Sequence, residues 1–222
     1  MEASFISFIS FRIEEESNSV SKIDESDTIE QDKVLLNRSW SFWENYETKT
    51  KGLQSYVIEE IYTFDNLISF WQFWNKYPGN DTKKIFYDGE YIKYFFKNKY
   101  RISAINLFEK GIRPEWEDEK NKGGNTLTLE YGTKECEENF FSFITEKWLK
   151  LMLYLIGETI PYNKYINGIR FVDKSKLGKF TTFRFEIWVN SSMTEKEIEE
   201  LKEYLYPEFK CKATVKRMQV TK

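Results

Sequence analysis

The order of its strand-like and helix-like segments is the feature that most limits how this chain can fold. Seven segments have the alternating or aromatic-rich pattern of β-strands, whereas three have the 3.6-residue spacing of helices. The strand-like segments are residues 40–46, 56–64, 102–108, 126–131, 166–172, 180–188 and 211–218. The expected helices are 65–74, capped by Asp65, then 137–156, then 194–205, which begins with a Thr194–Glu197 capping box and stops before Pro207. Because few neighbouring strands are separated by a helix, we expect an α+β fold with an antiparallel sheet.

Charge and composition divide the 222 residues into an amino-terminal tail and a body. Residues 1–33 carry nine acidic and three basic side chains, a net charge of −6, which leaves +3 for the remainder of a chain whose total is −3. Few large apolar residues occur within 14–33, so we expect this tail to be disordered. Residues 34–222 then form a single domain, with an aromatic-rich insertion near 78–100. The apolar residues 5–13 are too few to span a membrane and lack the features of a signal peptide.

The chain contains no histidine and only two cysteines. Without histidine, catalytic triads based on serine or cysteine are excluded, and the commonest neutral metal ligand is missing. Cys136 and Cys211 are far apart in the sequence and cannot hold zinc by themselves. We therefore expect no metal, no cofactor and a reducing compartment, which is the cytoplasm, with the nucleus as a second location. A mildly basic body suits a small phosphorylated ligand better than a long duplex.

The polar segment 112–124 holds an aromatic side chain, Trp116, directly before a carboxylate, Glu117, and ends in two glycines. An indole can stack on a nucleobase, and an ionised carboxylate offers only hydrogen-bond acceptors. Guanine is the common base whose Watson–Crick edge presents two adjacent N–H donors, so this pair of residues fits guanine. Two other interpretations remain open. One is a solvated acidic loop whose tryptophan folds back on the sheet, and the other, because four acids lie within 115–119, is the carboxylate pair of a glycosidase.

The expected helix at 137–156 carries more apolar surface than one core stripe needs. Its main stripe is formed by Phe140, Ile144, Trp148, Leu151 and Leu155. At 100° per residue, Leu149 and Leu153 fall outside this stripe, beside Lys150. These two leucines indicate either a second buried contact or a binding site for a partner.

Several short motifs lie along residues 34–218. The densest is Trp116-Glu117-Asp118-Glu119-Lys120-Asn121-Lys122-Gly123-Gly124. The others are Asn37-Arg38 with Trp40 and Trp43, Phe64-Asp65, Phe70-Trp71, Trp148-Leu149, Leu155-Ile156-Gly157-Glu158 and Ile187-Trp188. Together, and in this order along the chain, these motifs resemble the eukaryotic translation initiation factor 4E family, the messenger-RNA cap-binding proteins. The resemblance implies a curved antiparallel sheet backed by three helices on its convex face, with a cap-binding slot on its concave face.

The resemblance also implies a role for each cap-binding residue. Trp116 corresponds to one of two aromatic plates that stack on 7-methylguanine, a cationic base. Glu117 corresponds to the carboxylate that binds the N1 and N2 hydrogens, and Trp188 to the residue beside the methyl group. The residues that would bind the triphosphate are Lys174, Arg184, Lys176 and Lys179, of which the last two lie in a loop that is longer than usual.

Two departures from the family pattern predict looser cap binding. The second stacking tryptophan of the family has no counterpart near residues 53–56. Tyr56 is the first candidate for this plate and Tyr46 the second, although Tyr56 also fits a plain strand residue. A family arginine after the double glycine is replaced by Asn125, which removes one positive charge from the phosphate site.

A second site is implied on the convex face. There the family binds an amphipathic helix from a scaffold subunit of the 4G type or from an inhibitory binding protein. The corresponding residues here are Trp71, Leu149, Leu153 and Gly157, with Leu35 and Leu36 extending the groove and Lys150 replacing an acidic residue. The chain is thus expected to be a monomeric, non-enzymatic protein that binds no membrane and recruits capped messenger RNA for translation initiation. The alternative is a divergent cap-binding translational repressor that does not engage the scaffold.

Overall fold

The computed structural model describes residues 34–50, 53–86, 94–95, 100–133, 138–175 and 181–218, all within a compact unit that begins at Val34. Its strands are β1 (Leu35–Thr50), β2 (Leu53–Asn66), β3 (Tyr94–Phe95), β4 (Tyr100–Glu109), β5 (Asn125–Thr133), β6 (Ile166–Asp173), β7 (Thr181–Val189) and β8 (Thr214–Arg217). Its helices are α2 (Leu67–Trp74), α3 (Thr82–Phe86), α4 (Glu138–Ile156) and α5 (Glu195–Phe209), with short 3-10 turns η1 (Pro78–Asn80) and η2 (Asn163–Tyr165). None of the described helices is long and apolar enough to cross a lipid bilayer.

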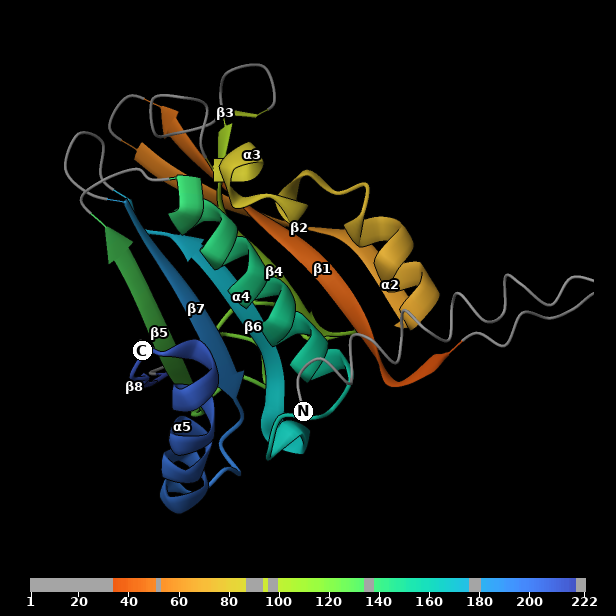
Figure 1. Ribbon diagram of the computed structural model, residues 1–222, viewed down its shortest axis with the longest axis vertical. Helices are drawn as coiled ribbons and strands as arrows, with labels where there is room; N and C mark the ends of the chain where they lie inside the picture. The colour runs from red at the N-terminus through yellow and green to blue at the C-terminus, as the bar shows by residue number, and fades with distance from the viewer. Residues whose placement is uncertain are drawn as a thin grey trace, which may run out of the picture. The chain divides into compact units, whose positions relative to one another are not determined.

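The strands form one antiparallel sheet in the order β2-β1-β4-β6-β7-β5-β8, and β3 pairs with β4 off this path. Figure 1 shows the sheet with α4 lying across it and with α2 and α5 on the same side. The predicted α+β fold, an antiparallel sheet backed by helices, is therefore confirmed.

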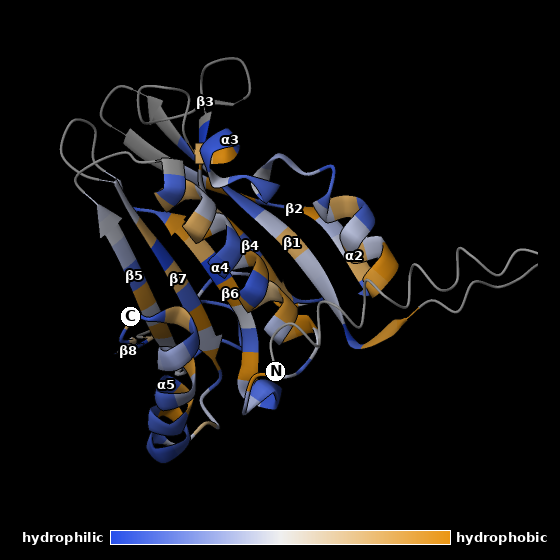
Figure 2. Cartoon of the chain, in the orientation of Figure 1, coloured by the Kyte–Doolittle hydropathy of each residue, from blue (hydrophilic) through white to orange (hydrophobic). Residues whose placement is uncertain are grey.

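Alternation along each strand decides which face the helices cover. On β7, Phe183, Phe185 and Ile187 are no more than 1% exposed and point toward the helices. Arg184 and Glu186, which lie between them, point the other way because successive side chains alternate across a strand. Figure 2 shows the resulting mixture of apolar and polar residues along the strands. We call the helix-covered side the convex face and the opposite side the concave face.

The main core fills the space between the convex face and the helices. Trp148 of α4 is fully buried, and its ring lies 5.4 Å from the ring of Phe171 and 5.7 Å from that of Phe185. Trp40 and Phe42 of β1 are fully buried in the same core. Burial of a large aromatic side chain stabilises a fold by about 2–3 kcal/mol, so this layer carries much of the stability.

Two helix boundaries differ from the sequence prediction. The N-cap of α2 is Asn66, whose side-chain oxygen accepts the Ser69 N–H at 2.8 Å, so the prediction that Asp65 caps this helix is wrong. The reason is that β2 continues through residue 66. Helix α5 has the predicted capping box but passes Pro207 and ends at Phe209. A proline this close to the end removes one backbone hydrogen bond, and burial of the Phe209 ring offsets that loss.

The first part of the expected insertion at 78–100 belongs to the core. Helix α3 is an addition to the three expected helices, and it is joined to α4 because the Thr82 N–H donates to the Thr145 hydroxyl at 3.0 Å. Phe86 is buried with its ring 5.0 Å from that of Phe171. Residues 87–93 and 96–99 lie outside the described residues.

Candidate functional site

The concave face has a small apolar cluster of its own, separate from the main core. Its members are Trp43, Phe108, Ile112, Trp188 and Met218, each no more than 7% exposed. The rings of Phe108 and Trp188 meet edge to face at 5.5 Å across Gly168, which pairs with both residues. A Cβ at Gly168 would lie 2.3 Å from the Phe108 ring, so only glycine lets the two rings meet. Trp188 therefore forms part of the floor of the concave face.

Polar side chains form the next row of this floor, which we call the polar ladder: Asn106, Arg170 and Glu186. The Arg170 Nε donates to the Asn106 Oδ1 at 2.9 Å, and its NH1 donates to the Glu186 Oε2 at 3.2 Å. Glu186 also accepts the indole N–H of Trp188 at 3.3 Å, and the Arg170 guanidinium lies 5.3 Å from the Trp188 ring centre. The ladder thus fixes the orientation of the Trp188 ring.

Residues 110–124, the tryptophan loop, connect β4 to β5 beside this floor. Asp118 accepts the backbone N–H of Arg113 at 3.0 Å and that of Lys120 at 2.9 Å. Asn121 is fully buried, and its Nδ2 donates to the carbonyl oxygens of Arg113 and Glu115, both at 2.8 Å. Because each of these two side chains makes two bonds within the loop, the loop has a fixed shape.

The carboxyl end of the tryptophan loop is fixed to the sheet. Asn167 at the start of β6 donates to the Asn121 Oδ1 at 2.9 Å. Gly123 has a φ of +69°, a conformation that favours glycine. A Cβ on Gly124 would lie 2.1 Å from the Val189 carbonyl oxygen, so the double glycine is needed for the chain to enter β5.

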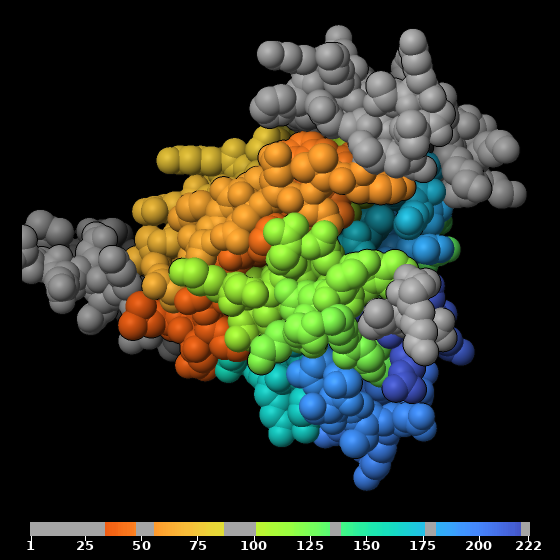
Figure 3. Space-filling model, turned by 180° about the vertical axis from the view of Figure 1, so that it is seen from behind, coloured from red at the N-terminus to blue at the C-terminus, as the bar shows by residue number. Residues whose placement is uncertain are grey.

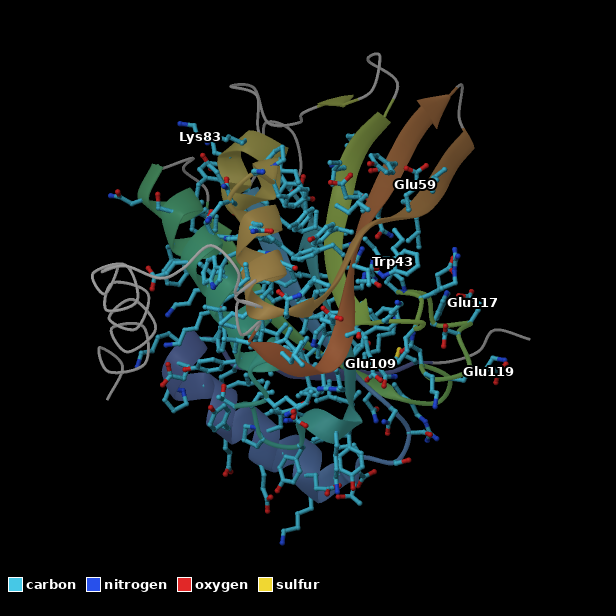
Figure 4. The ribbon with its side chains drawn as sticks, turned by 90° about the vertical axis from the view of Figure 1, so that its right-hand side faces the viewer. Trp43, Glu59, Lys83, Glu109, Glu117 and Glu119 are labelled. Atoms are coloured by element: carbon cyan, nitrogen blue, oxygen red, sulfur yellow. The ribbon has the colours of Figure 1, made fainter. Side chains whose placement is uncertain are left out.

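Trp116 and Glu117 project from this fixed loop. Trp116 is 43% exposed and belongs to neither hydrophobic cluster, so it does not fold back on the sheet. Glu115 and Glu119 each form an ion pair with a basic residue of the same loop. Glu117 is exposed and has no hydrogen bond or ion pair within the described part of the chain. Figure 4 shows it on the side of the sheet opposite the helices. The loop therefore presents one aromatic ring next to one available carboxylate.

The register of the β1–β2 hairpin distinguishes the two tyrosine candidates. Ile58 packs against the concave cluster, so Tyr56, two residues before it on β2, also belongs to the concave face, and it is 59% exposed. Tyr46 instead packs against the main core, and its hydroxyl donates to the Glu44 carboxylate. Burial and this carboxylate raise the pKa of Tyr46 well above its ordinary value. Tyr46, the second choice from the sequence, is therefore on the wrong face to stack on a ligand.

Tyr56 is not face to face with Trp116 in this structure. Trp43 is the member of the concave cluster that lies on β1, and it pairs with Glu60 of β2. Tyr56 lies four residues from Glu60 toward the hairpin tip, which places it about 13 Å along the strand from this cluster. Among the described residues no ring contact joins Tyr56 to Trp116. Figure 3 shows the concave face with the hairpin, in orange, above the tryptophan loop, in green. Tyr56 as the second stacking plate remains a prediction.

Two of the four predicted phosphate ligands are described, and both are on the concave face. Lys174 is exposed just beyond β6, and its backbone N–H donates to the Thr182 carbonyl at 2.8 Å. Arg184 follows Thr182 by two residues along β7. Lys174 and Arg184 are therefore diagonal neighbours about 7–8 Å apart. Arg184 forms an ion pair with Glu130 of β5. The other two, Lys176 and Lys179, lie outside the described residues.

The predicted partner residues lie on the helices of the convex side. Trp71, Leu149 and Leu153 pack against the main core but remain partly exposed. Gly157, just beyond α4, is exposed, and Leu35 at the start of β1 is 70% exposed. The two leucines outside the main stripe thus make a buried contact and still offer apolar surface. Whether a partner binds there stays a prediction.

A second charged cluster was missed by sequence reasoning, as was the polar ladder. Arg101 on β4 donates to the carboxylate of Glu47 at 2.5 Å and to that of Asp173 at 3.2 Å, and both acidic residues are no more than 5% exposed. Both acids fall just outside the strands expected at 40–46 and 166–172, so no sequence signal pointed to this cluster. The strand register was needed to find Arg101. Nowhere in the described ranges do three or more acidic or cysteine side chains gather in a way that could hold a metal ion.

Comparison with known proteins agrees with this architecture. A family model for eukaryotic initiation factor 4E matches residues 35–217. Eukaryotic translation initiation factor 4E of Candida albicans is 30% identical over 139 residues, which cover 62% of this chain and 57% of that protein. The isoform 4E-2 of Zea mays is 28% identical over 137 residues, covering 60% of this chain and 52% of that protein. The matches thus span little more than half the length of these relatives.

Solved structures share the fold at lower identity. Ascaris suum eIF4E-3 in complex with an m2,2,7G cap has a TM-score of 0.60 and 17% identity, with coverage of 86% of this chain and 94% of that one. A schistosome eIF4E in complex with m7GpppA and 4E-BP has a TM-score of 0.58 and 17% identity, covering 84% and 89%. Since the family model covers most of the sequence, the chain belongs to the eukaryotic initiation factor 4E family.

Proposed function

We propose that the concave face binds the 7-methylguanosine cap of messenger RNA and that the protein is a binding factor, not an enzyme. Family membership supports this, and the observation that carries it is the tryptophan loop. Its internal hydrogen bonds hold Trp116 and Glu117 exposed before any ligand arrives. A site that is already ordered loses less conformational entropy on binding, so more of the contact energy becomes affinity.

Stacking on Trp116 selects the methylated base. Methylation at N7 gives guanine a positive charge, and an electron-rich indole attracts a cation over its face. A base stacked on an aromatic side chain gains about 1–3 kcal/mol. Tyr56 is exposed on the same face of the sheet and becomes the second plate if the hairpin bends toward the tryptophan loop. Trp188, on the floor, lies beside the methyl group.

Glu117 selects guanine among the bases. Its ionised carboxylate accepts the N1 and N2 hydrogens in two parallel charge-assisted hydrogen bonds. Adenine and uracil do not present two adjacent donors, so they would leave part of the carboxylate unpaired. The local ion pairs of Glu115 and Glu119 leave Glu117 as the acid of this loop that is available to a ligand.

The triphosphate extends from the base toward Lys174 and Arg184. These two cations are neighbours on the concave face, and we assign Lys176 and Lys179 of the same connection to this role. Arg184 already pairs with the exposed Glu130, so part of its charge is neutralised. Asn125 supplies no charge where the family has arginine. Both features predict weaker phosphate binding than in a relative with a full set of cations.

Retention on 7-methylguanosine resin tests this assignment. The wild-type protein should be retained and should elute with 7-methyl-GTP but not with GTP. Trp116→Ala and Glu117→Ala should each lose retention, whereas Glu119→Ala, in the same loop, should keep it. Retention of both variants would place the cap elsewhere.

We further propose that the protein delivers capped messenger RNA to translation initiation through the convex face, where Trp71, Leu149 and Leu153 receive an amphipathic helix. The other candidate is a cap-binding repressor that does not engage the scaffold. One observation favours it: Lys150, where the family has an acid, forms an ion pair with Glu208 and changes the charge of this surface.

Binding of a scaffold-type helical peptide, measured by calorimetry, separates the two roles. The initiation role predicts binding that Trp71→Ala weakens and that Tyr206→Ala, an exposed aromatic residue on α5, leaves unchanged. A wild-type protein that binds the cap but ignores such peptides would support the repressor.

A further inference from the structure

The cluster around Arg101 lies at the root of the connection between β6 and β7. The Arg101 side chain is 14% exposed and bridges Glu47 on β1 to Asp173, the last residue of β6. The Asp173 side chain is 2% exposed, so its position is fixed by its partners. Three strands that are neighbours in the sheet are thereby joined where the connection begins.

The second carboxylate oxygen of Asp173 holds the connection itself. The Asp173 Oδ1 accepts the backbone N–H of Ser175 at 2.9 Å. The Ser175 hydroxyl in turn accepts the backbone N–H of Thr182 at 3.0 Å. Lys174 lies between Asp173 and Ser175, and its own backbone N–H donates to the Thr182 carbonyl oxygen. The backbone on both sides of Lys174 is thus fixed by one chain of hydrogen bonds that ends at Arg101.

We propose that Arg101 and Asp173 are positioning residues that hold Lys174 where it binds the phosphates of the ligand, an inference that rests on the proposed function. Neighbouring residues of an extended chain point in opposite directions. Asp173 is therefore held by the sheet while the Lys174 side chain remains exposed, without an ion pair in the described part of the chain. An ordered backbone lowers the entropy lost when the flexible lysine meets a phosphate.

Charge and position predict opposite results for the substitution Asp173→Asn. Two carboxylates and one guanidinium leave an excess negative charge near Lys174, so charge alone predicts that removing it strengthens phosphate binding. The positioning role predicts the reverse, that Asp173→Asn weakens phosphate binding. Arg101 and Ser175 donate to different oxygens of Asp173. In Asp173→Asn one of these oxygens becomes an NH2 group, which cannot accept, so one link must break.

The experiment compares the affinities for 7-methyl-GTP and 7-methylguanosine, measured by quenching of tryptophan fluorescence. The ratio of the two affinities isolates the contribution of the phosphates. We expect Asp173→Asn to lower this ratio about tenfold, the effect of one weakened charge-assisted contact, and to change nucleoside affinity less than about twofold. Ser175→Ala keeps the charge of Asp173 and the backbone N–H of residue 175, and removes the hydroxyl that bonds to the Thr182 N–H and carbonyl. It should lower the ratio about threefold and serves if Asp173→Asn does not fold.

Glu158→Gln is the matched control, because Glu158 pairs with Arg38, which also bridges two carboxylates but lies away from the β6–β7 connection. Its ratio should equal that of the wild type. A ratio that stays constant or rises in Asp173→Asn and stays constant in Ser175→Ala would overturn the positioning role while leaving cap binding intact. A wild-type protein that binds neither ligand would overturn the proposed function, and the positioning role with it.

Discussion

The two faces of the sheet are built from alternate residues of the same strands, yet they have opposite chemistry. On β6 and β7, Phe171 and Phe185 are buried beneath the helices, while their neighbours Arg170 and Glu186 form the polar ladder on the concave face. Burial of aromatic rings stabilises the fold, whereas a partly buried ion pair roughly recovers its desolvation cost. Stability therefore depends mainly on the convex face and recognition on the concave face. We expect substitutions on the convex face to unfold the protein and substitutions on the concave face to weaken ligand binding only.

The largest effect on stability is expected from Phe185→Ala on the convex face. The ring contacts Trp148, Phe171 and Tyr131, so its removal leaves a cavity and should lower the free energy of unfolding by about 3–5 kcal/mol. Urea denaturation measures this. The fraction that remains folded should bind 7-methyl-GTP with unchanged affinity, and a parallel loss of affinity would contradict the division between faces.

Trp116→Ala should have the opposite profile. Loss of one stacking plate worth about 2 kcal/mol should weaken 7-methyl-GTP binding about 30-fold, as measured by calorimetry. The side chain is outside both hydrophobic clusters, so the free energy of unfolding should change by less than about 0.5 kcal/mol. A variant whose stability falls as much as its binding would show that the ring supports the fold.

Asn121→Ala should be an exception and lower both stability and ligand affinity, because this buried residue on the concave side holds the tryptophan loop together. Loss of its bonds to the carbonyls of Arg113 and Glu115, and of the bond that its Oδ1 accepts from Asn167, should cost about 1–3 kcal/mol of stability. Ligand affinity should fall as well, since the loop is no longer ordered before binding. Glu119→Ala in the same loop is the control that should change neither quantity.

The smallest effect concerns pH. Burial raises the pKa of the Asp173 carboxyl above its ordinary value of 3.8, despite hydrogen bonds from Ser175 and Arg101 that act the other way. Between 3.8 and that raised pKa, the folded state holds a proton that the unfolded state has lost. This group therefore contributes stability that is present below pH 3.8 and is lost as the pH rises through its folded pKa.

Asp173→Asn removes this contribution. The difference in unfolding free energy between variant and wild type should change across this pH window, in favour of the variant at the higher pH. Denaturation at a series of pH values would show it. A difference that does not vary with pH would mean that the carboxyl has its ordinary pKa.

The sequence predicted the convex face better than the concave one. Apolar alternation in β7 and the helical stripe through Trp148 depend on local spacing alone, and both are confirmed. The side of the sheet on which Tyr46 and Tyr56 lie depends on the bulge after Phe42 and on the pairing of β1 with β2. That register is a tertiary property, so the sequence placed Tyr56 first and Tyr46 second but could not exclude Tyr46.

Charged clusters show the same limit. Arg101, Glu47 and Asp173 come from three strands that are distant in the sequence, and only the sheet order brings them together. The end of α5 depends similarly on burial of Phe209, which a rule about Pro207 could not include. Local rules thus locate elements and single motifs, while contacts between distant strands require the structure.

The most direct measurement is a crystal structure of the protein with 7-methyl-GTP. We expect the methylated base to stack on Trp116, with its N1 and N2 atoms within hydrogen-bonding distance of the Glu117 carboxylate and its phosphates near Lys174 and Arg184. An empty concave face in crystals grown with saturating ligand, or the ligand bound at another surface, would contradict it.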